Sequence, residues 1–505
     1  MRQVNGGTLP RRLLGVGAIA TSLAGWSFFD GDAGMPGVAR AAEPQPTVFD
    51  QNWQSPVVRP IAPVYFQQGV DAPPPEVAPG ETPPAEMTPN SEPPPAAAKA
   101  EGEEEEPKEQ EMWVLTNIFD DGCGGNWFKE HNIRLGGNVA QSMTFNFQSP
   151  SDRFNGPVTW TDRSNEYQLN QLWFYMEKTT DTSKKDFDIG GRFDVLYGTN
   201  SRLTTESGLE VGHLNAGHAF YGTAFPQFYV ETAYKKLKIK TGHFISPVGY
   251  FTVDTTQNFF NTIPYTYQWG EPFTHTGSLA TYQFSDQFVA GVGLIRGWDN
   301  FDNSNPNLGV MGTEAYTWKD KSSLAHVWFY SHEPNQLNQF TRRYYQSLVY
   351  SKPLSEKTNY VIQSDFGVQD NALVNGKTAH WYGVNQYLFY IQNEKVTWGL
   401  NFEWWRDEQG FRVAGFLPGS APSGITGPNR GWGTSPFQGG YNGNFFQTTM
   451  GPKIQFTKNL FLRPNLRFDW YNGHTNDLNP AQLKPFNDGK SDFQALFVTD
   501  LCLLF

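Results

Sequence analysis

The sequence predicts an all-β protein whose fold class is a transmembrane, antiparallel, up-and-down β-barrel of about 16 strands. Three observations predict this fold. Apolar and polar residues alternate with a period of two over many short segments between 133 and 505. Short turns and long loops follow these segments in strict alternation, which is typical of barrels with short periplasmic turns and long extracellular loops. The last segment, 492–505, keeps its alternation up to a terminal Phe505.

The composition agrees with a sheet that has one apolar face and one polar face. Aromatic residues make up 15% of the 505 residues and charged residues only 17%. The mean hydropathy is nevertheless −0.53, because Asn, Gln, Thr, Ser and Gly stand between the aromatics. A soluble enzyme of this length would carry more charge and longer aliphatic runs. The pattern instead favours strands that face lipid on one side and water on the other.

Residues 1–41 are predicted to be a secretory signal peptide. Arg11 and Arg12 precede an apolar run over 13–26, and a small-residue cleavage site follows at 39–41. An uncleaved membrane anchor is the alternative, but the run is shorter than a spanning helix requires. We therefore expect the mature chain to meet a membrane through strands.

Residues 42–112 are predicted to be a disordered, Pro- and Glu-rich periplasmic linker. From 43 to 112 there are 14 Asp and Glu against three Lys and Arg, which gives this segment a net charge of −11 of the chain's −12. Such a segment cannot bury enough apolar area to offset its ordering entropy. A tether is the simpler interpretation, and a docking arm for the cell wall or a periplasmic partner is the alternative. The acidic balance argues against nucleic-acid binding. Residues 113–132 connect the linker to the barrel.

The barrel is predicted to span 133–505. Its sixteen strands are expected near 133–147, 167–178, 186–199, 225–235, 236–245, 276–284, 286–298, 309–318, 322–332, 341–351, 358–368, 378–391, 395–406, 445–456, 459–471 and 492–505. A slip of one residue would turn the charged side chains of a strand toward lipid. Each Arg placed there near mid-membrane costs about 2–4 kcal/mol, so the alternation fixes the register.

Two stretches resemble a known family. They are 242–250, which reads Gly-His-Phe-Ile-Ser-Pro-Val-Gly-Tyr, and 272–277, which reads Pro-Phe-Thr-His-Thr-Gly. Together with 297–299 (Gly-Trp-Asp) and 168–172 (Gln-Leu-Asn-Gln-Leu), they are similar to the putative β-barrel porin family of the OmpL-like kind. The resemblance covers most of 131–505 and implies an outer-membrane porin of a Gram-negative-type envelope. An acidic residue often follows the Gly-Tyr pair in that family, whereas Phe251 stands here, which leaves the charge of the narrow zone open.

A barrel of 16 strands leaves a water-filled channel. We therefore expect passive diffusion of small hydrophilic solutes and ions. Strand parity predicts a set of charged residues on the lumen wall: Arg134, Arg192, Asp194, Glu231, Asp365, Glu403, Arg463, Arg467 and Asp469. Two interpretations stay open. Arg134, Arg463 and Arg467 form one basic wall, or the charges pair across strands and hold the lumen in shape.

The long loop 246–275 is the candidate constriction. It contains Asp254 and Glu271 among many aromatic residues, and it follows the fifth strand, where trimeric general porins fold a loop into the channel. Such an apolar loop is expected either to pack inside the barrel or to cover a neighbouring subunit or partner.

The remaining expectations concern chemistry and partners. Cys123 and Cys502 form a disulfide across the periplasmic mouth or stay as two free thiols. No catalytic motif, metal-site spacing or cofactor motif is found, so we expect no enzyme, metal or cofactor. The expected partners are outer-membrane lipid, the barrel-assembly machinery through the C-terminal strand, and two further copies in a homotrimer. The alternative function is a secreted all-β carbohydrate-binding protein or glycosidase, with sugar-stacking residues Trp404, Trp405, Trp432 and Trp470.

Overall fold

The computed structural model describes most of the chain from residue 114 onward. The described residues are 57–58, 114–122, 127–151, 153–206, 208–210, 220–302, 305–413, 441–473 and 484–505. The predicted signal peptide (1–41), and the predicted linker (42–112) apart from 57–58, lie outside this set.

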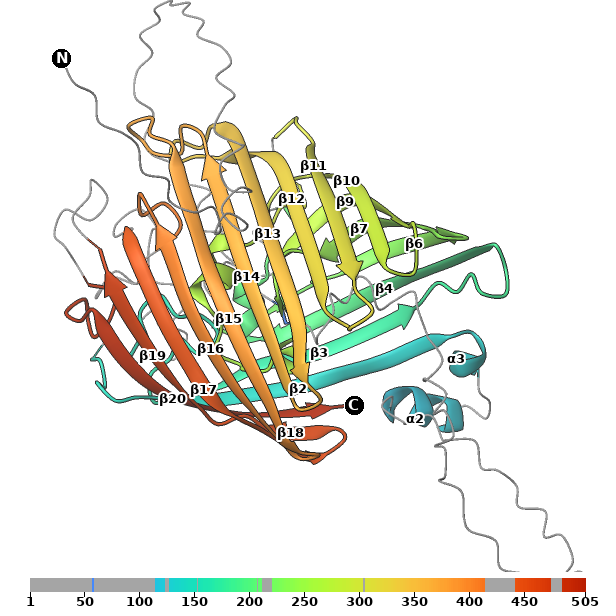
Figure 1. The fold of residues 1–505 in the computed structure, drawn as a ribbon, viewed down its shortest axis with the longest axis horizontal. Helices are drawn as coiled ribbons and strands as arrows, with labels where there is room; N and C mark the ends of the chain where they lie inside the picture. The colour runs from blue at the N-terminus through green and yellow to red at the C-terminus, as the bar shows by residue number, and fades with distance from the viewer. Residues whose placement is uncertain are drawn as a thin grey trace, which may run out of the picture. The chain divides into compact units, whose positions relative to one another are not determined.

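A closed antiparallel barrel of 16 strands forms the body of the protein (Figure 1). Eighteen segments make up the ring, because β5 and β6 share one strand, as β18 and β19 do. The segments are β2 (Ile133–Asn146), β3 (Glu166–Lys178), β4 (Phe187–Gly198), β5 (Gly222–Ala224), β6 (Phe228–Tyr234), β7 (Leu237–Ile245), β9 (Thr274–Gln283), β10 (Phe288–Ile295), β11 (Gly309–Thr317), β12 (Ser323–Pro334), β13 (Phe340–Ser355), β14 (Thr358–Gln369), β15 (Ala379–Asn393), β16 (Val396–Asp407), β17 (Gly443–Thr457), β18 (Leu460–Leu462), β19 (Asn465–Asn472) and β20 (Phe493–Leu504). The predicted fold class is confirmed.

Most of the predicted strands agree with the observed ones to within two or three residues. Two differences have a local cause. The predicted strand 459–471 is interrupted between β18 and β19, where Pro464 has no N–H to donate to a neighbour. β9 begins at Thr274, so the long loop before it ends at 273 rather than 275.

The ring closes where the first strand meets the last. β2 pairs with β20 in antiparallel register, with Val139 opposite Leu503 and Phe145 opposite Phe497. At the end of this seam the N–H of Gly137 donates to the carbonyl of Phe505 at 2.8 Å, and the N–H of Phe505 donates back at 3.0 Å. The predicted neighbourhood of the first and sixteenth strands is therefore confirmed, and the terminal residue belongs to the seam.

The two ends of the barrel differ. Short turns, such as those at 235–236 and 394–395, join strands at one end, here called the short-turn end. Long loops join strands at the other end, here called the long-loop end. Two helices, α2 (Val114–Gly122) and α3 (Trp127–Glu130), occupy the predicted connector before β2. The hydroxyl of Thr116 exchanges hydrogen bonds with the backbone of Leu135, which ties α2 to the first strand.

Other short elements lie outside the ring. β8 (Phe251–Thr252), the 3₁₀ turn η3 (Thr255–Gln257) and the π-helical turn η4 (Thr266–Gly270) belong to one long loop, and η2 (Thr199–Leu203) to another. β1 (Val57–Val58) pairs with β8. Among the described residues no helix is both long and apolar enough to cross a membrane.

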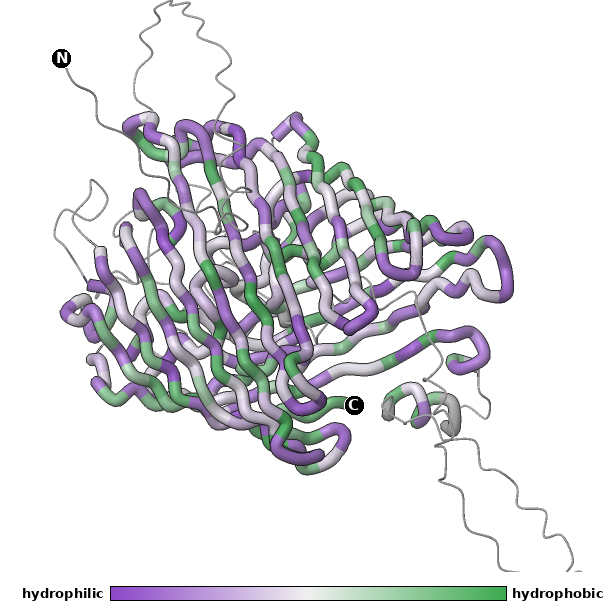
Figure 2. The backbone as a smooth tube through the Cα atoms, viewed as in Figure 1, coloured by the Kyte–Doolittle hydropathy of each residue, from purple (hydrophilic) through white to green (hydrophobic). Residues whose placement is uncertain are grey.

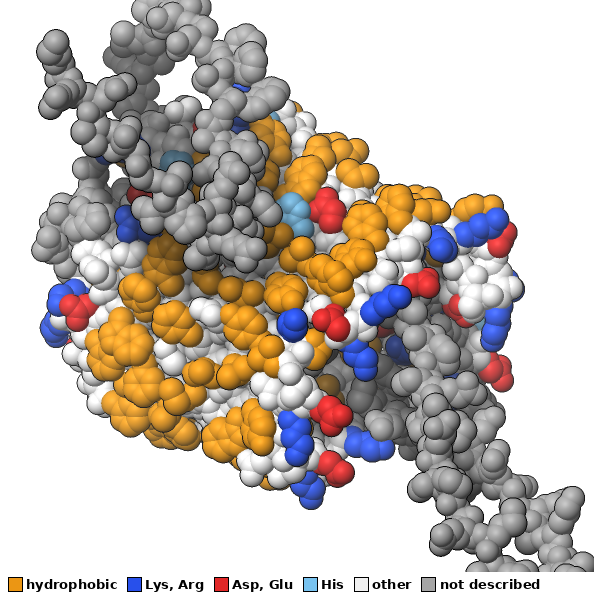
Figure 3. Space-filling view, in the orientation of Figure 1, with side chains coloured by type: hydrophobic (Ala, Val, Ile, Leu, Met, Phe, Trp, Pro, Cys, Tyr) orange, Lys and Arg blue, Asp and Glu red, His pale blue; other side chains and the backbone are white. Residues whose placement is uncertain are grey.

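Hydrophobic and hydrophilic residues are interleaved along the strands (Figure 2), and the burial of their side chains alternates as the period of two predicts. On β4, Phe187 is 52% exposed and Phe193 is 44% exposed, whereas Asp194, the residue after Phe193, is fully buried. Hydrophobic side chains cover much of the outer face seen in Figure 3, and charged side chains gather near its edge. The exposed face is therefore the apolar one, which is the inverse of a water-soluble protein and fits contact with lipid.

This sorting yields a stability prediction. Leu400 lies near the middle of β16 and points outward, with 40% of its surface exposed. We expect Leu400→Arg to destabilise the barrel by about 2–4 kcal/mol in lipid vesicles, because the guanidinium would sit in hydrocarbon. Urea unfolding of the folded barrel measures the change, and Leu400→Ala is the matched control. Equal stability of the two variants would contradict an outward-facing Leu400.

Candidate functional site: a segment that crosses the lumen

The residues between β7 and β9, 246–273, cross the inside of the barrel and are here called the cross-lumen segment. In the ring of 16 strands, β16 lies eight strands from β7, on the opposite side. The segment leaves the wall at β7 yet makes side-chain hydrogen bonds with β2, β3, β14, β16 and β19. The long loop therefore packs inside the barrel, the first of the two placements that the sequence allowed.

Glu403 holds the far end of the cross-lumen segment. Its carboxylate accepts the backbone N–H groups of Tyr265 (2.7 Å) and Thr266, at the start of the η4 turn. The hydroxyl of Tyr265 donates to Asp469 on β19 at 2.8 Å. Two carboxylates predicted to line the lumen thus bind the segment. Glu403 accepts the unpaired N–H groups at the start of a helical turn, and Asp469 accepts a side-chain hydroxyl.

Two buried arginines bridge the wall and the segment. Arg463 forms an ion pair with Asp500 and donates to the carbonyl of Thr255 at 2.8 Å. Arg467 pairs with Asp469 at 2.8 Å and donates to the hydroxyl of Thr262 at 2.9 Å. A guanidinium has five N–H donors, so it can satisfy a carboxylate and a backbone carbonyl together.

These pairs bear on the two interpretations of the lumen charges on this side. Arg463 and Arg467 each face a carboxylate, and all four side chains of the two pairs are fully buried. Arg463 pairs across strands with Asp500 of β20, and Arg467 pairs with Asp469 of its own strand β19. This pairing favours the interpretation in which the charges hold the lumen in shape.

The first half of the segment is fixed by amides. Asn138 on β2 donates to Asp254 at 2.9 Å, and Asp254 in turn accepts the N–H of Thr256 at 3.0 Å, which caps the η3 turn. Gln171 on β3 uses both ends of its carboxamide: it donates to the carbonyl of Val253 and accepts the N–H of Thr255 at 3.0 Å. Because one carboxamide both donates to and accepts from this stretch of backbone, it holds the backbone in one position.

Glu271 meets the wall through a shared amide. Gln363 on β14 donates to Glu271 and to Asp365, at 2.7 Å for the latter, while its oxygen accepts the N–H of Tyr250 at 3.0 Å. Burial raises the pKa of Glu271 well above its ordinary value, and the nearby Asp365 raises it further. The neutral form of Glu271 is therefore favoured. A Cβ at Gly249, which has φ of 78°, would collide with this carboxyl group.

The other predicted lumen residues lie on a different part of the wall. Arg192 pairs with Asp194 at 2.7 Å and with Glu177 at 3.6 Å. Glu231 accepts the hydroxyl of Thr180 and lies 3.6 Å from the ammonium of Lys238. Arg134 is half-buried, opposite Glu177 in the β2–β3 register. The predicted set therefore divides into residues that hold the segment and residues that pair within the wall.

Several residues that contact the cross-lumen segment, its partners on the wall or the loops beside it were not predicted from the sequence. Asp500, Gln171 and Gln363 stand at inward positions of their strands, so strand parity could have identified them. Arg343, at an inward position of β13, could have been identified in the same way, whereas Arg412 lies on a loop and could not. The guanidinium groups of Arg343 and Arg412 lie 4.6 and 4.3 Å from the ring of Trp298, on a loop, and Arg412 also donates to the carbonyl of Trp269 at 2.7 Å.

The side chain of Cys502 is buried, and its sulfur lies 3.2 Å from a carboxylate oxygen of Asp500. Cys123 lies outside the described residues, so the disulfide between the two remains a prediction. Among the described residues, no group of three or more His, Cys, Asp and Glu side chains is arranged to hold a metal ion.

Comparison with known proteins gives a family and several structural relatives. Residues 132–505 match the family described as "Putative beta-barrel porin-2, OmpL-like". A comparison with curated proteins finds no match. Among solved structures, the outer membrane channel DcaP of Acinetobacter baumannii is 10% identical, covering 74% of this chain and 97% of its own, with a TM-score of 0.47. OprB of Pseudomonas putida at high pH is 11% identical over 76% and 97%, with a TM-score of 0.49. An anion-selective porin from Comamonas acidovorans is 12% identical over 74% and 99%, with a TM-score of 0.47.

The contacts of Glu403 give a prediction for the segment. In Glu403→Gln an NH₂ group replaces one acceptor oxygen and faces a backbone N–H. We expect the docked state to lose about 1.5–3 kcal/mol, the usual worth of a hydrogen bond to a charged group. Chymotrypsin should then cleave faster after Tyr265 or Tyr267, as mass spectrometry can measure. Glu394→Gln, in an exposed short turn, is the control. Equal cleavage rates in both variants would remove Glu403 from this role.

Proposed function

Since residues 132–505 match the OmpL-like β-barrel porin family, the chain belongs to that family, and we propose that the protein allows small hydrophilic solutes and ions to diffuse passively across the outer membrane. The family places the protein in the outer membrane and gives it a channel function. The observation that carries the proposal is the closed ring of 16 strands, apolar outside and polar inside.

The width of the ring supports diffusion rather than a packed core. Side chains alone fill an eight-stranded barrel, whereas a barrel of 16 strands leaves a channel. We propose that the cross-lumen segment narrows this channel. Its support is the set of hydrogen bonds from Glu403, Arg463, Arg467 and Asp469 on the wall opposite β7, which hold it across the interior. Because the segment is fixed at several points, the width that it leaves open stays constant and limits the size of the solutes that pass.

Processing and assembly complete the proposal. Residues 1–41 direct export, residues 42–112 act as a periplasmic tether, and the C-terminal strand β20 is read by the barrel-assembly machinery. The mature barrels associate as a homotrimer through part of their apolar outer face. Chemical cross-linking in native membranes tests the trimer, and a monomer-only pattern would reject it.

Deletion of residues 252–270 tests the narrowing. We expect the shortened protein to show a higher single-channel conductance in planar bilayers, because most of the cross-lumen segment is gone. Heat-dependent gel mobility should first confirm that the variant forms a barrel.

Removal of 375–377, an exposed loop tip, is the matched control and should leave the conductance unchanged. Unchanged conductance after the 252–270 deletion would contradict the narrowing role but leave the porin function intact. A wild-type protein that inserts and passes no ions would contradict the porin function itself.

A further inference from the structure

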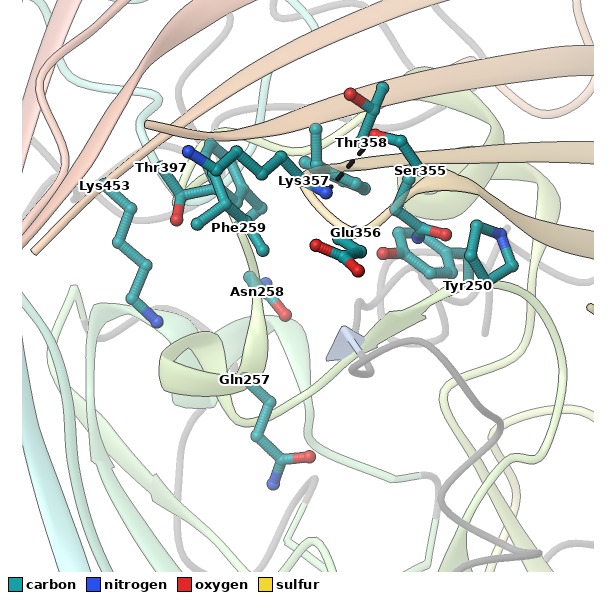
Figure 4. A pocket seen from close by; sticks show the side chains of 14 residues that line it. Tyr250, Gln257, Asn258, Phe259, Ser355, Glu356, Lys357, Thr358, Thr397 and Lys453 are labelled. Carbon is teal, nitrogen blue, oxygen red and sulfur yellow. Dashed lines mark hydrogen bonds between the residues drawn. The ribbon is translucent and has the colours of Figure 1, made fainter. Parts of the chain in front are cut away.

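A cavity of about 380 Å³ lies between the cross-lumen segment and the short-turn end of the barrel. The segment contributes Tyr250 and residues 257–259, and the β13–β14 turn contributes residues 355–358. Figure 4 shows these side chains around a common space, with Thr397 and Lys453 of the neighbouring wall. The cavity is therefore built from both the wall and the segment, and solutes that have passed the segment would meet it next.

Aromatic rings form one side of the cavity. Phe389 stands in the middle, with the ring centroid of Phe259 at 4.9 Å and that of Tyr250 at 6.4 Å. All three line the cavity. The rings are tilted by 43° and 31° against that of Phe389, so they form a curved apolar surface rather than one plane. The negative quadrupole of an aromatic ring face favours contact with the polarised C–H groups of a ring-shaped solute.

Two carboxamides in the cavity lack partners in the described part of the protein. Asn258 is 1% exposed and Asn359 is 8% exposed, and neither the oxygen nor the nitrogen of either side chain has a hydrogen bond. Both residues line the cavity. Buried carboxamides are normally paired, because leaving them unpaired costs stability. Together they present donors and acceptors in equal number, which suits hydroxyl groups, since a hydroxyl both donates and accepts.

The charged groups of the lining do not select one sign. Lys357 and Lys453 are accompanied by Glu356, and the ammonium of Lys453 lies 4.0 Å from the ring centroid of Phe461. A charged solute would therefore meet both signs of charge in the same cavity. Aromatic rings beside neutral donors and acceptors that lack partners within the ranges that the structure describes suit a pocket for a neutral polar molecule.

We propose that this cavity is a binding site for a neutral saccharide of one or two rings. The ring faces of the sugar lie on Phe389 and Phe259, and its hydroxyls bond to Asn258 and Asn359. The inference rests on the proposed porin function, for which it names a substrate class. It makes the channel a porin with a sugar subsite on the exit side of its constriction.

The test uses maltose as the probe. In planar bilayers, maltose up to about 100 mM, enough to fill a site of millimolar affinity, should reduce the ion current through the wild-type channel. Sorbitol, which has hydroxyls but no ring face, should not. Asn359→Leu and Phe389→Leu should each raise the half-blocking maltose concentration about threefold to tenfold, which corresponds to one lost hydrogen bond or ring contact. Asn375→Leu, the same substitution on an exposed loop at the long-loop end, is the control and should not change it.

Equilibrium dialysis of the detergent-solubilised protein with labelled maltose measures binding independently of current. A channel that conducts ions but shows neither block nor binding would overturn the saccharide site and leave the porin function standing. Block that is equal in wild type, Asn359→Leu and Phe389→Leu would also overturn it, because the sugar would then bind elsewhere. Absence of ion current in the wild type would reject the porin function, and dialysis would still decide the cavity.

Discussion

Hydrocarbon offers no partner for a backbone N–H or C=O group, and this constraint shapes the whole barrel. A sheet in lipid must pair each strand on both sides, which only a closed ring achieves. The seam between β2 and β20 meets this demand. Once the ring is closed, alternate residues must face lipid, so every other position on a strand is free to be polar. The charged and amide side chains of the lumen are a consequence of that alternation, because only the inner face can accept them.

Inside the ring, the polar wall binds protein as well as water. Glu403, Arg463 and Arg467 form hydrogen bonds with the cross-lumen segment. Each of the two arginines also forms an ion pair with a carboxylate of the wall. A buried charge is tolerated only where it is paired and hydrogen-bonded. Removing the segment would leave Glu403 without its two N–H donors and the two arginines with their wall carboxylates alone. The wall and the segment therefore stabilise each other, and the cross-lumen segment is part of the folded core.

Much of the fold could be predicted from the sequence, because a strand with lipid on one side and water on the other alternates apolar and polar residues with a period of two. The strand boundaries, the loop sorting and the inward position of residues such as Asp469 all follow from it. The position of a residue in this alternation predicts whether its side chain points to lipid or into the lumen, but not which groups it contacts there. It left open whether Arg463 was part of a basic surface or paired with an acidic residue across strands, as it is with Asp500. Contacts made by loops, such as Arg412 beside Trp298, could not be predicted, because irregular segments carry no periodicity that places them in space.

The hydrogen bonds between Gly137 and Phe505 have a consequence for biosynthesis. β2 gains its permanent neighbour only when β20, which lies more than 300 residues later in the chain, pairs with it. Until then the sheet has two open edges, and open edges recruit other strands. Pairing residues so far apart in the chain is also slow. A polypeptide without β20 is therefore not a slightly smaller barrel. It is a sheet whose edges at β2 and β19 are unpaired and open to pairing with other chains.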